Sequence, residues 1–503
     1  MSLKIDSTLT AKKLLPRLER MFNLSGEKIL SIEKSWKPEQ GTPVFTVKGR
    51  YTSRGWTEWT QGFQFGSALL QFDATGDEKF LEMGRRNTIE RMATHVSHVG
   101  VHDHGFNNIS TYGNLLRLMH DGKIEWNDRE KDFYELALKV SGAVQAARWT
   151  SLDTRKGFIF SFNGPHSLFI DTMRTLRVLA VSHQLGHALM GEQDRRISLL
   201  TRLLEHCATT TRHAIYYGRG RDAFDVRGRV AHESIFNIND GSYRCPNSQQ
   251  GYSPFSTWTR GLTWAILGFS EELEFLNTLA GEEINYALSP TWIVDTIKAI
   301  SKPGQARRWR SLRNSLRENA QSIVRQVINS MLAAAAATAD FYLAHCSADG
   351  IPMWDTGAPN LHRLPARYLD KPADPFNKWE PVDSSAAAIA AQGLIRLGNY
   401  LHATRNTQHA ARYRRAGLTI TRTLLEEPYL STNPRHQGLL LHSVYHRPNG
   451  WDYIAPGQKV PNGESSMWGD YHLRELALML LREARGEPYL TFFGCVPRAR
   501  SSP

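Results

Sequence analysis

The segment Gln249–Gly268, QQGYSPFSTWTRGLTWAILG, concentrates residues that handle sugars. Trp258 and Trp264 provide flat apolar faces of the kind on which sugar rings stack. Arg260 is a permanent cation whose guanidinium can hold a carboxylate through two hydrogen bonds. Gln250 can donate and accept hydrogen bonds at the same time. This composition indicates a sugar site in which a carboxylate is one partner.

The same segment has the pattern of a helix that begins near Ser256 or Thr257, either of which could cap it. Arg260 and Trp264 then lie one turn apart on one face. An amphipathic core helix with an exposed arginine has the same spacing, and for an isolated W-x-R motif it is the more common outcome. The spacing alone therefore leaves both interpretations open.

Working outward, most of the chain has a helical pattern, which predicts an all-α fold. A first helix is expected over Thr8–Met21, and a loop or small hairpin over Ile29–Gly49. Further helices are expected over Gln61–Phe72, Glu78–His95, Ser110–His120, Arg129–Thr150, Asp171–Leu185, Gln193–Tyr217, Ser256–Phe269, Ser315–His345, Ser384–His402, Thr407–Leu425 and Gly469–Glu483. Long helices joined by polar turns fit a toroid of paired helices. An irregular bundle or a solenoid is the alternative, although no repeat of fixed length supports a solenoid.

The net charge of +12 over 503 residues indicates an anionic partner, such as a polyuronate, nucleic acid or anionic lipid. The densest basic cluster, ARRWRSLR ending at Arg313, interleaves its charges with Trp and Leu at helical spacing. That spacing is typical of a solvated helix face, so nucleic-acid binding is not expected.

The four cysteines are far apart and indicate reduced thiols: Cys207, Cys245, Cys346 and Cys495. The N-terminal MSLKIDSTLTAKKLL lacks the apolar run of a signal peptide, and no stretch is expected to span a bilayer. We therefore expect a cytoplasmic protein with no membrane partner, unless a processed leader is missing from the sequence.

Two aspartates could carry chemistry. Asp171, in SLFIDTMRTL, has apolar neighbours that should raise the pKa of its carboxyl, as a general acid or base requires. A helix N-cap that accepts from the Arg174 N–H is the alternative for Asp171. Asp103 lies between His102 and His104, but no third ligand follows at a suitable spacing. We therefore expect no metal site and no cofactor.

The stretch QGYSPFSTWTRGLTW resembles the signature QG-x-S-x-x-S-x-W-x-RG-x-x-W of the unsaturated glucuronyl hydrolases, glycoside hydrolase family 88. Further stretches match that family in the same order. They are WTQGF (Trp59–Phe63), HDHGF (His102–Phe106), FIDTMRTL (Phe169–Leu176), DSSAAAIAAQGL (Asp383–Leu394) and WGDYHLRELAL (Trp468–Leu478). Each motif alone is weak, whereas their shared order over most of the chain is specific.

The resemblance implies an (α/α)6 barrel with inserted rim segments, whose inner helices present their ends to a catalytic cleft. It implies Asp171 as the general acid and base, and Asp103 as a second essential carboxylate. It also implies a set of substrate-binding residues: Trp59, His102, His232, Gln250, Trp258, Arg260 and Trp264. Asp383 fits a helix cap better than a position at the cleft rim.

The implied reaction hydrates the C4=C5 vinyl ether of a 4,5-unsaturated uronic acid at the non-reducing end of an oligosaccharide, and so releases that residue. The expected partner is thus an unsaturated uronic-acid oligosaccharide made by a polysaccharide lyase. A hydrolase of unsaturated rhamnogalacturonyl groups and a non-catalytic toroid that binds acidic glycans remain as alternatives. The oligomeric state is left open.

The expected organisation has three parts. Residues 1–55 form an N-terminal helix and loop packed on the barrel, 56–490 the catalytic barrel, and 491–503 a tail. Inserts are expected at about 107–150 and 273–330, with a shorter excess at 218–229, and their basic content would favour a polyanionic chain. The sequence departs from the family pattern at Val382, where arginine is usual, and after HDHGF. Both departures bear on the identity of the substrate chain.

Overall fold

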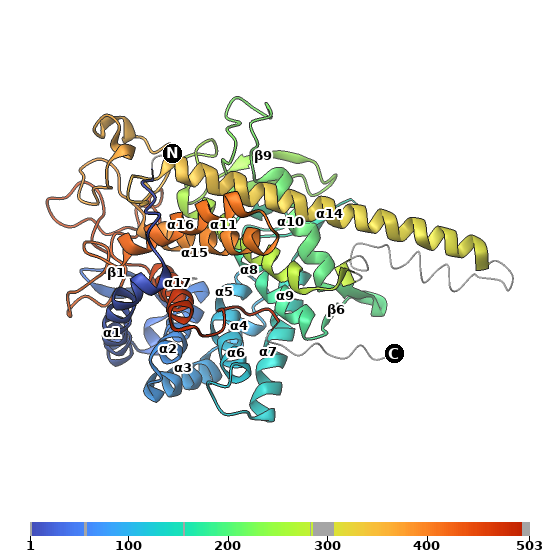
Figure 1. Cartoon of the computed structure of the whole chain (residues 1–503), viewed down its shortest axis with the longest axis horizontal. Coiled ribbons are helices and arrows are strands. Elements are labelled where there is room, and N and C mark those ends of the chain that lie inside the picture. Colours follow the sequence, from blue (N-terminus) through green and yellow to red (C-terminus); the bar gives the residue numbers. More distant parts are fainter. Residues whose placement is uncertain (1–2, 55–57, 154–155, 282, 285–305, 495–503) are drawn as a thin grey trace.

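The computed structural model describes residues 3–54, 58–153, 156–281, 283–284 and 306–494 (Figure 1). Within these residues, inner helical segments form a closed ring in which each contacts the next and the last contacts the first. In ring order they are α2 (Gln61–Thr75), α5–η3–α6 (His104–Asn108, Ile109–Gly113, Asn114–His120), α8–α9 (Thr172–Thr175, Arg177–Gln184), α11 (Thr259–Thr278), α15 (Ser384–Ala403) and α17 (Met467–Arg485). Side chains on all sides of these helices are buried, which explains the long apolar and small-residue runs in the motifs.

Outer helices lie against the inner ring and bury one face each. They are α1 (Ala11–Ser35), α3 (Glu78–Arg91), α7 (Asp128–Ala147), α10 (Leu199–His213), α14 (Ala306–His345) and α16 (Thr407–Leu424), with the short α4 (Ala93–Val96) after α3. Pairing an outer helix with each inner segment produces the (α/α)6 toroid that the resemblance implied. The closed ring excludes both the irregular bundle and the solenoid.

Most expected helices are present, with shifted ends. α1 continues to Ser35, into the stretch expected as loop, because its apolar stripe continues through Ile29 and Ile32 against the ring. A hairpin, one of the two forms expected there, follows it as β1 (Pro43–Val47) and β2 (Arg50–Ser53), so that its second strand lies beyond the expected end at Gly49. α1 contacts α17 and α2, and the segment 107–150 supplies part of an inner segment and the outer helix α7. Residues 282, 285–305 and 495–503, which include Cys495, lie outside the described part.

Short antiparallel strands, which the helical pattern did not predict, connect several helices. They are β3 (Trp149–Asp153) with β4 (Lys156–Ile159), β6 (Ala188–Met190) with β7 (Arg196–Ser198), and the sheet β5–β8–β9 (Ser167–Phe169, Glu233–Phe236, Tyr243–Asn247). The expected helix over Gln193–Tyr217 is therefore wrong before Leu199, and the one over Arg129–Thr150 is wrong after Ala147. Strands of three to five residues are too short to show a period of their own.

The first half of α14 projects beyond the ring in Figure 1. Its Val324–His345 part is long and apolar enough, by length and composition, to cross a membrane, so the expectation of no such stretch is wrong by that criterion. Half of that segment is buried, and α14 packs against α10 and α11. The side chains of the basic cluster ending at Arg313 lie outside the described residues. The three described cysteines are free thiols, as expected.

Candidate active site

A pocket of about 820 Å³, partly open to solvent, lies where inner segments and the β5–β8–β9 sheet meet. Eight of the nine site residues expected from the sequence line it: Trp59, His102, Asp103, Asp171, Gln250, Trp258, Arg260 and Trp264. The remaining lining residues are His98, Val101, Phe106, Phe162, Phe169, Gln249, Tyr445, His446 and Trp451. The fold thus brings together side chains that are up to 392 positions apart in the sequence (Trp59 to Trp451).

Asp171 lies between the end of β5 and the start of α8. Its main chain is fixed on both sides, because the Ile170 N–H donates to the His232 carbonyl and the Arg174 N–H to the Asp171 carbonyl. The carboxyl group caps nothing: Oδ1 is buried and accepts no hydrogen bond from any described residue, so the N-cap interpretation is wrong. Burial raises the pKa of Asp171 to about 7, against the opposing charge of Arg260 and with help from Asp103.

Asp103 immediately precedes α5 and is as buried as Asp171. Burial raises the pKa of its carboxyl to about 7, although the Arg148 guanidinium acts in the opposite direction. His102 Nε2 lies 3.7 Å from Asp103 Oδ1, and neither ring nitrogen of His102 has a hydrogen-bond partner within the described structure. Burial lowers the pKa of His102, so its imidazole is neutral and free to donate or accept in the pocket.

Two backbone segments in close contact carry the aspartates. A Cβ atom added to Gly105 would lie 2.1 Å from the Thr175 carbonyl oxygen and 2.5 Å from its Cα. Gly105 follows Asp103 by two positions and Thr175 follows Asp171 by four, so glycine lets the two segments approach. The shared pocket and the effect of the Asp103 charge on the pKa of Asp171 reflect this proximity.

The β5–β8–β9 sheet places the histidine and the glutamine segment beside Asp171. His232 immediately precedes β8, and its Nδ1 accepts from the N–H groups of Gln249 (3.1 Å) and Gln250 (3.4 Å). Burial lowers the pKa of His232 to about 3, so the ring is neutral and its hydrogen is on Nε2. His232 itself does not line the pocket; it packs behind the wall, against Phe169 and Trp258 at 4.6 Å between ring centroids.

Arg260, at the start of α11, is held between Trp258 and Trp468, with its guanidinium carbon 4.6 Å from each ring centroid. Nη2 donates to Gln250 Oε1 (2.7 Å) and to the Tyr445 carbonyl (2.9 Å), and Nη1 donates to the Val444 carbonyl. The sequence suggested that the Arg260 guanidinium could hold a ligand carboxylate through two hydrogen bonds. In this structure a carboxylate could do so only by displacing some of these protein acceptors.

Arg260 also forms a buried ion pair with Asp383. Nη1 lies 3.6 Å from Asp383 Oδ2, while Asp383 Oδ1 accepts from the N–H groups of Ser385 and Ala386. The helix-cap interpretation of Asp383 is therefore confirmed. Arg260 connects this cap to the loop that follows residue 444.

Aromatic rings form most of the pocket wall. Trp59 stacks on Trp468 at 5.1 Å, and Trp264 packs on Phe106 at 5.0 Å. Three further lining residues, Tyr445, His446 and Trp451, were missed from the sequence. They come from the loop HSVYHRPNGWD, whose composition is that of an ordinary turn. Asp452 shapes this loop by accepting from the N–H groups of Tyr445 (2.5 Å) and His446 (3.1 Å).

The described residues contain no group of three or more His, Cys, Asp or Glu side chains that could hold a metal ion. His104, which flanks Asp103, does not line the pocket. Its Nδ1 lies 2.9 Å from Ser141 Oγ and its Nε2 lies 2.9 Å from the His98 carbonyl.

Known proteins resemble the chain over most of its length, although no family model matches it. The unsaturated glucuronyl hydrolase of Bacillus sp. (strain GL1) is 24% identical over 453 residues, which cover 88% of this chain and 90% of that protein. That of Formosa agariphila is 22% identical over 425 residues, covering 83% and 78%. The crystal structure of the Bacillus enzyme shares the fold, with a TM-score of 0.63 at 19% identity over 93% of this chain and 97% of that one.

The sequence matches and the shared toroid agree with the order of motifs along the chain and with the pocket that those motifs form. The chain is a distant homologue, over most of its length, of the unsaturated glucuronyl hydrolases of glycoside hydrolase family 88.

Proposed function

We propose that the protein is a hydrolase that releases 4,5-unsaturated uronic acid from the non-reducing end of oligosaccharides. The observation that carries this proposal is the pair of buried carboxyls, Asp171 and Asp103, each with a pKa raised to about 7, in one aromatic pocket. A carboxyl that is protonated near neutrality can donate a proton to a carbon of an electron-rich alkene. The aromatic walls offer surfaces for sugar rings.

In the proposed reaction, Asp171 transfers its proton to C4 of the vinyl ether, and C5 becomes an oxocarbenium-like centre. The resulting Asp171 carboxylate takes a proton from a water molecule as the water oxygen bonds to C5. The hemiketal then opens, and the bond to the aglycone sugar breaks as that sugar leaves with a proton. One residue thus acts first as acid and then as base. The Asp103 carboxylate stabilises the positive charge that develops at C5.

Residues around the pair have distinct roles in this proposal. Trp59, Trp258 and Trp264 provide apolar surface to the sugar, and His102 and Gln250 hydrogen-bond its polar groups. His232 acts through Gln250, because its Nδ1 accepts from the Gln250 N–H at 3.4 Å. Arg260 holds the Gln250 side chain through Oε1 at 2.7 Å.

Ligands of the relatives support the substrate class. One homologous structure holds dGlcA-Glc-Rha-Glc, and another, from Streptococcus agalactiae, holds dGlcA-GalNAc6S. A toroid that only binds acidic glycans gains nothing from two carboxyls in its pocket, since ionised carboxyls repel an anionic ligand. The pocket therefore favours an enzyme over a pure binding protein.

The test is loss of the near-ultraviolet absorption of the conjugated enoate when defined unsaturated disaccharides are supplied. The panel should include products of hyaluronan, chondroitin, heparin, gellan, ulvan and rhamnogalacturonan lyases. Turnover of unsaturated glucuronides supports the proposal, and turnover of the rhamnogalacturonan product alone supports the rhamnogalacturonyl alternative. Binding without absorbance loss for every member of the panel contradicts a hydrolase.

We expect a bell-shaped pH profile with both limbs near neutrality. The proposed reaction needs a proton on Asp171 and a charge on Asp103, so the pair must hold one proton. Because both pKa values lie at about 7, raising the pH through that value removes the acid, and lowering it neutralises Asp103. Initial rates from about pH 5 to about pH 9 check this. Constant turnover across the alkaline half of that range would contradict an acid with this pKa.

Replacing Arg260 by Ala should weaken both substrate binding and folding. The change releases Gln250 and the loop at Tyr445, and leaves the Asp383 carboxylate buried beside no cation. We expect KM to rise about tenfold, and the free energy of unfolding to fall by about 3–5 kcal/mol. Steady-state kinetics and thermal unfolding measure the two effects.

Arg367→Ala is the matched control, because this arginine pairs with Asp370 on the surface, with its side chain 84% exposed. Its removal should change stability by less than about 1 kcal/mol and leave KM unaltered. An Arg260→Ala variant that behaves like this control would show that the stacked guanidinium supports neither the pocket nor the fold.

A further inference from the structure

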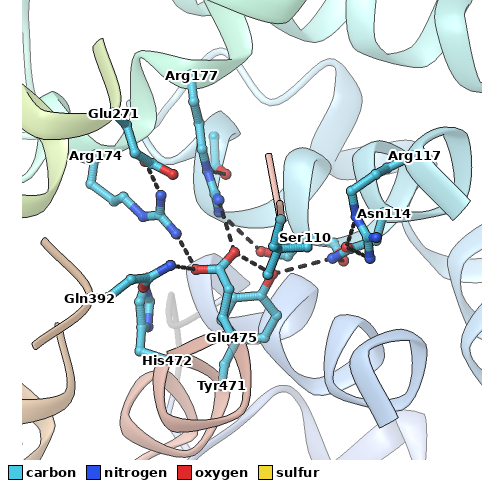
Figure 2. Close-up of polar contacts among 12 residues, drawn as sticks. Ser110, Asn114, Arg117, Arg174, Arg177, Glu271, Gln392, Tyr471, His472 and Glu475 are labelled. Atoms are coloured by element: carbon cyan, nitrogen blue, oxygen red, sulfur yellow. Dashed lines mark hydrogen bonds and ion pairs between the residues drawn. The ribbon is translucent and has the colours of Figure 1, made fainter. Parts of the chain in front are cut away.

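Inside the ring of inner helices, and outside the pocket lining, charged side chains meet in a buried ionic cluster (Figure 2). Its members are Arg174, Arg177, Glu271, Gln392, Tyr471 and Glu475. The side chains of Arg174, Arg177 and Glu475 are 0% exposed. The proposed reaction uses none of these groups.

Glu475, on α17, is the centre of the cluster. Oε2 accepts from Arg174 Nη2 and from Gln392 Nε2 (2.9 Å), and Oε1 accepts from Arg177 Nη1 (3.3 Å) and the Tyr471 hydroxyl (3.3 Å). Burial raises the pKa of Glu475, but the two guanidiniums outweigh burial and hold that pKa well below its usual range. Glu475 is therefore a permanent anion with four donors.

Each arginine held by Glu475 is attached to the segment of one proposed catalytic aspartate. Arg174 follows Asp171 in the same turn, and its N–H donates to the Asp171 carbonyl at 3.0 Å. Arg177 reaches the other segment, where Nε donates to the Gly105 carbonyl at 3.0 Å, two positions after Asp103. Its Nη2 also donates to Ser110 Oγ at 3.3 Å. One carboxylate on the closing helix thus fixes both aspartate-bearing segments.

We propose that Glu475 is a positioning residue that sets the relative placement of Asp171 and Asp103 by holding Arg174 and Arg177. This inference rests on the proposed function, because it assigns Glu475 to the same reaction. Glu475 acts at a distance from the substrate, since it does not line the pocket.

Two physical arguments favour positioning over a role in stability alone. Burying ion pairs costs so much desolvation that an apolar core of the same volume is often at least as stable, so such a cluster is a poor source of stability. Its directional hydrogen bonds instead fix distances between backbone segments. Proton transfer depends steeply on such distances, because a displacement of about 1 Å can reduce the rate about a hundredfold.

The test is Glu475→Gln, which keeps the shape of the side chain and removes the charge that both arginines share. We expect kcat to fall about 10- to 100-fold and KM to change less than about threefold, because the pocket surface is unaltered. Hydrogen–deuterium exchange should rise in residues 103–110 and 171–177. Thermal unfolding should show that the variant is folded at the assay temperature.

Glu274→Gln is the matched control. Glu274 is a partly buried carboxylate of the inner helix α11, and it accepts from Arg396 Nη1 (2.6 Å) and the Tyr489 hydroxyl (2.7 Å). Neither of these hydrogen bonds joins it to an aspartate segment. This variant should lose stability while kcat and exchange at 103–110 and 171–177 stay at the wild-type level. Arg177→Lys, which keeps the charge but loses the Nε–Gly105 bond, should lower kcat as Glu475→Gln does.

A Glu475→Gln variant with the kcat of the Glu274→Gln control would overturn the inference. If Glu475→Gln does not fold, Arg177→Lys decides between the same two outcomes. If the wild-type protein turns over no unsaturated uronide, the proposed function is wrong. Hydrogen–deuterium exchange then tests by itself whether Glu475 fixes the two segments. Faster exchange in both segments for Glu475→Gln, but not for Glu274→Gln, then supports positioning, and equal protection contradicts it.

Discussion

The Asp171→Asn variant is expected to lose at least about 10³-fold in kcat while remaining folded. An amide cannot donate a proton to C4 or take one from water, so both halves of the proposed reaction lose their catalyst. The fold should tolerate the change because Asn has the same shape and Oδ1 of Asp171 has no hydrogen-bond partner among the described residues. The rate of enoate loss and the thermal unfolding temperature are the measurements.

Asp340→Asn controls for the chemical change itself. Asp340, on α14, pairs with Arg227 and Arg412 and does not line the pocket. We expect wild-type kcat for this variant with some loss of stability. Wild-type turnover by Asp171→Asn would show that another group is the acid.

The Asp103→Asn variant should have the second largest effect, a fall in kcat of about 10²-fold or more. The reaction loses the negative charge that stabilises the cationic centre at C5. The same charge raises the pKa of Asp171, so its removal lowers that pKa. The alkaline limb of the pH profile should consequently move to lower pH.

Rates measured across the pH range, on Asp103→Asn and on the Asp340→Asn control, separate the two effects. The control should keep the wild-type profile. An Asp103→Asn enzyme with reduced kcat but an unmoved alkaline limb would mean that Asp103 does not interact with the ionised acid.

The helical ring is the part of the fold that the sequence predicted best. α2, α11, α15 and α17 lie where their motifs are, because helices buried on all sides contain long runs of apolar and small residues that the sequence shows. The ends were less predictable. α1 runs past its expected end because Ile29 and Ile32 continue its apolar stripe, which packs against the ring.

The strands of the β5–β8–β9 sheet were not predicted from the sequence, although they position residues of the site. β5 and β8 are three and four residues long, too short for a period of two to stand out. Their pairing is nevertheless what sets His232 beside the residue before Asp171. These strands pair across more than 60 positions of the sequence, so their pairing depends on long-range contacts and not on neighbouring residues.

The site divides in the same way. The motifs identified Asp103, Asp171 and the tryptophans as pocket residues, because a motif consists of residue types in a fixed order, which can be read directly from the sequence. They missed Tyr445, His446 and Trp451, whose loop looks like any turn until Asp452 and Arg260 hold it against the pocket.

The sequence by itself determined the helical class, and through its motifs it singled out Asp103 and Asp171 as candidate site residues; their catalytic roles are part of the proposed function. Only the tertiary structure decided that Asp171 caps no helix, that Arg260 is engaged by protein acceptors, and that Glu475 connects both aspartate segments. The reason is physical. Residue type fixes which proton or charge a side chain can carry, whereas burial, partner distances and desolvation arise only when remote segments pack together.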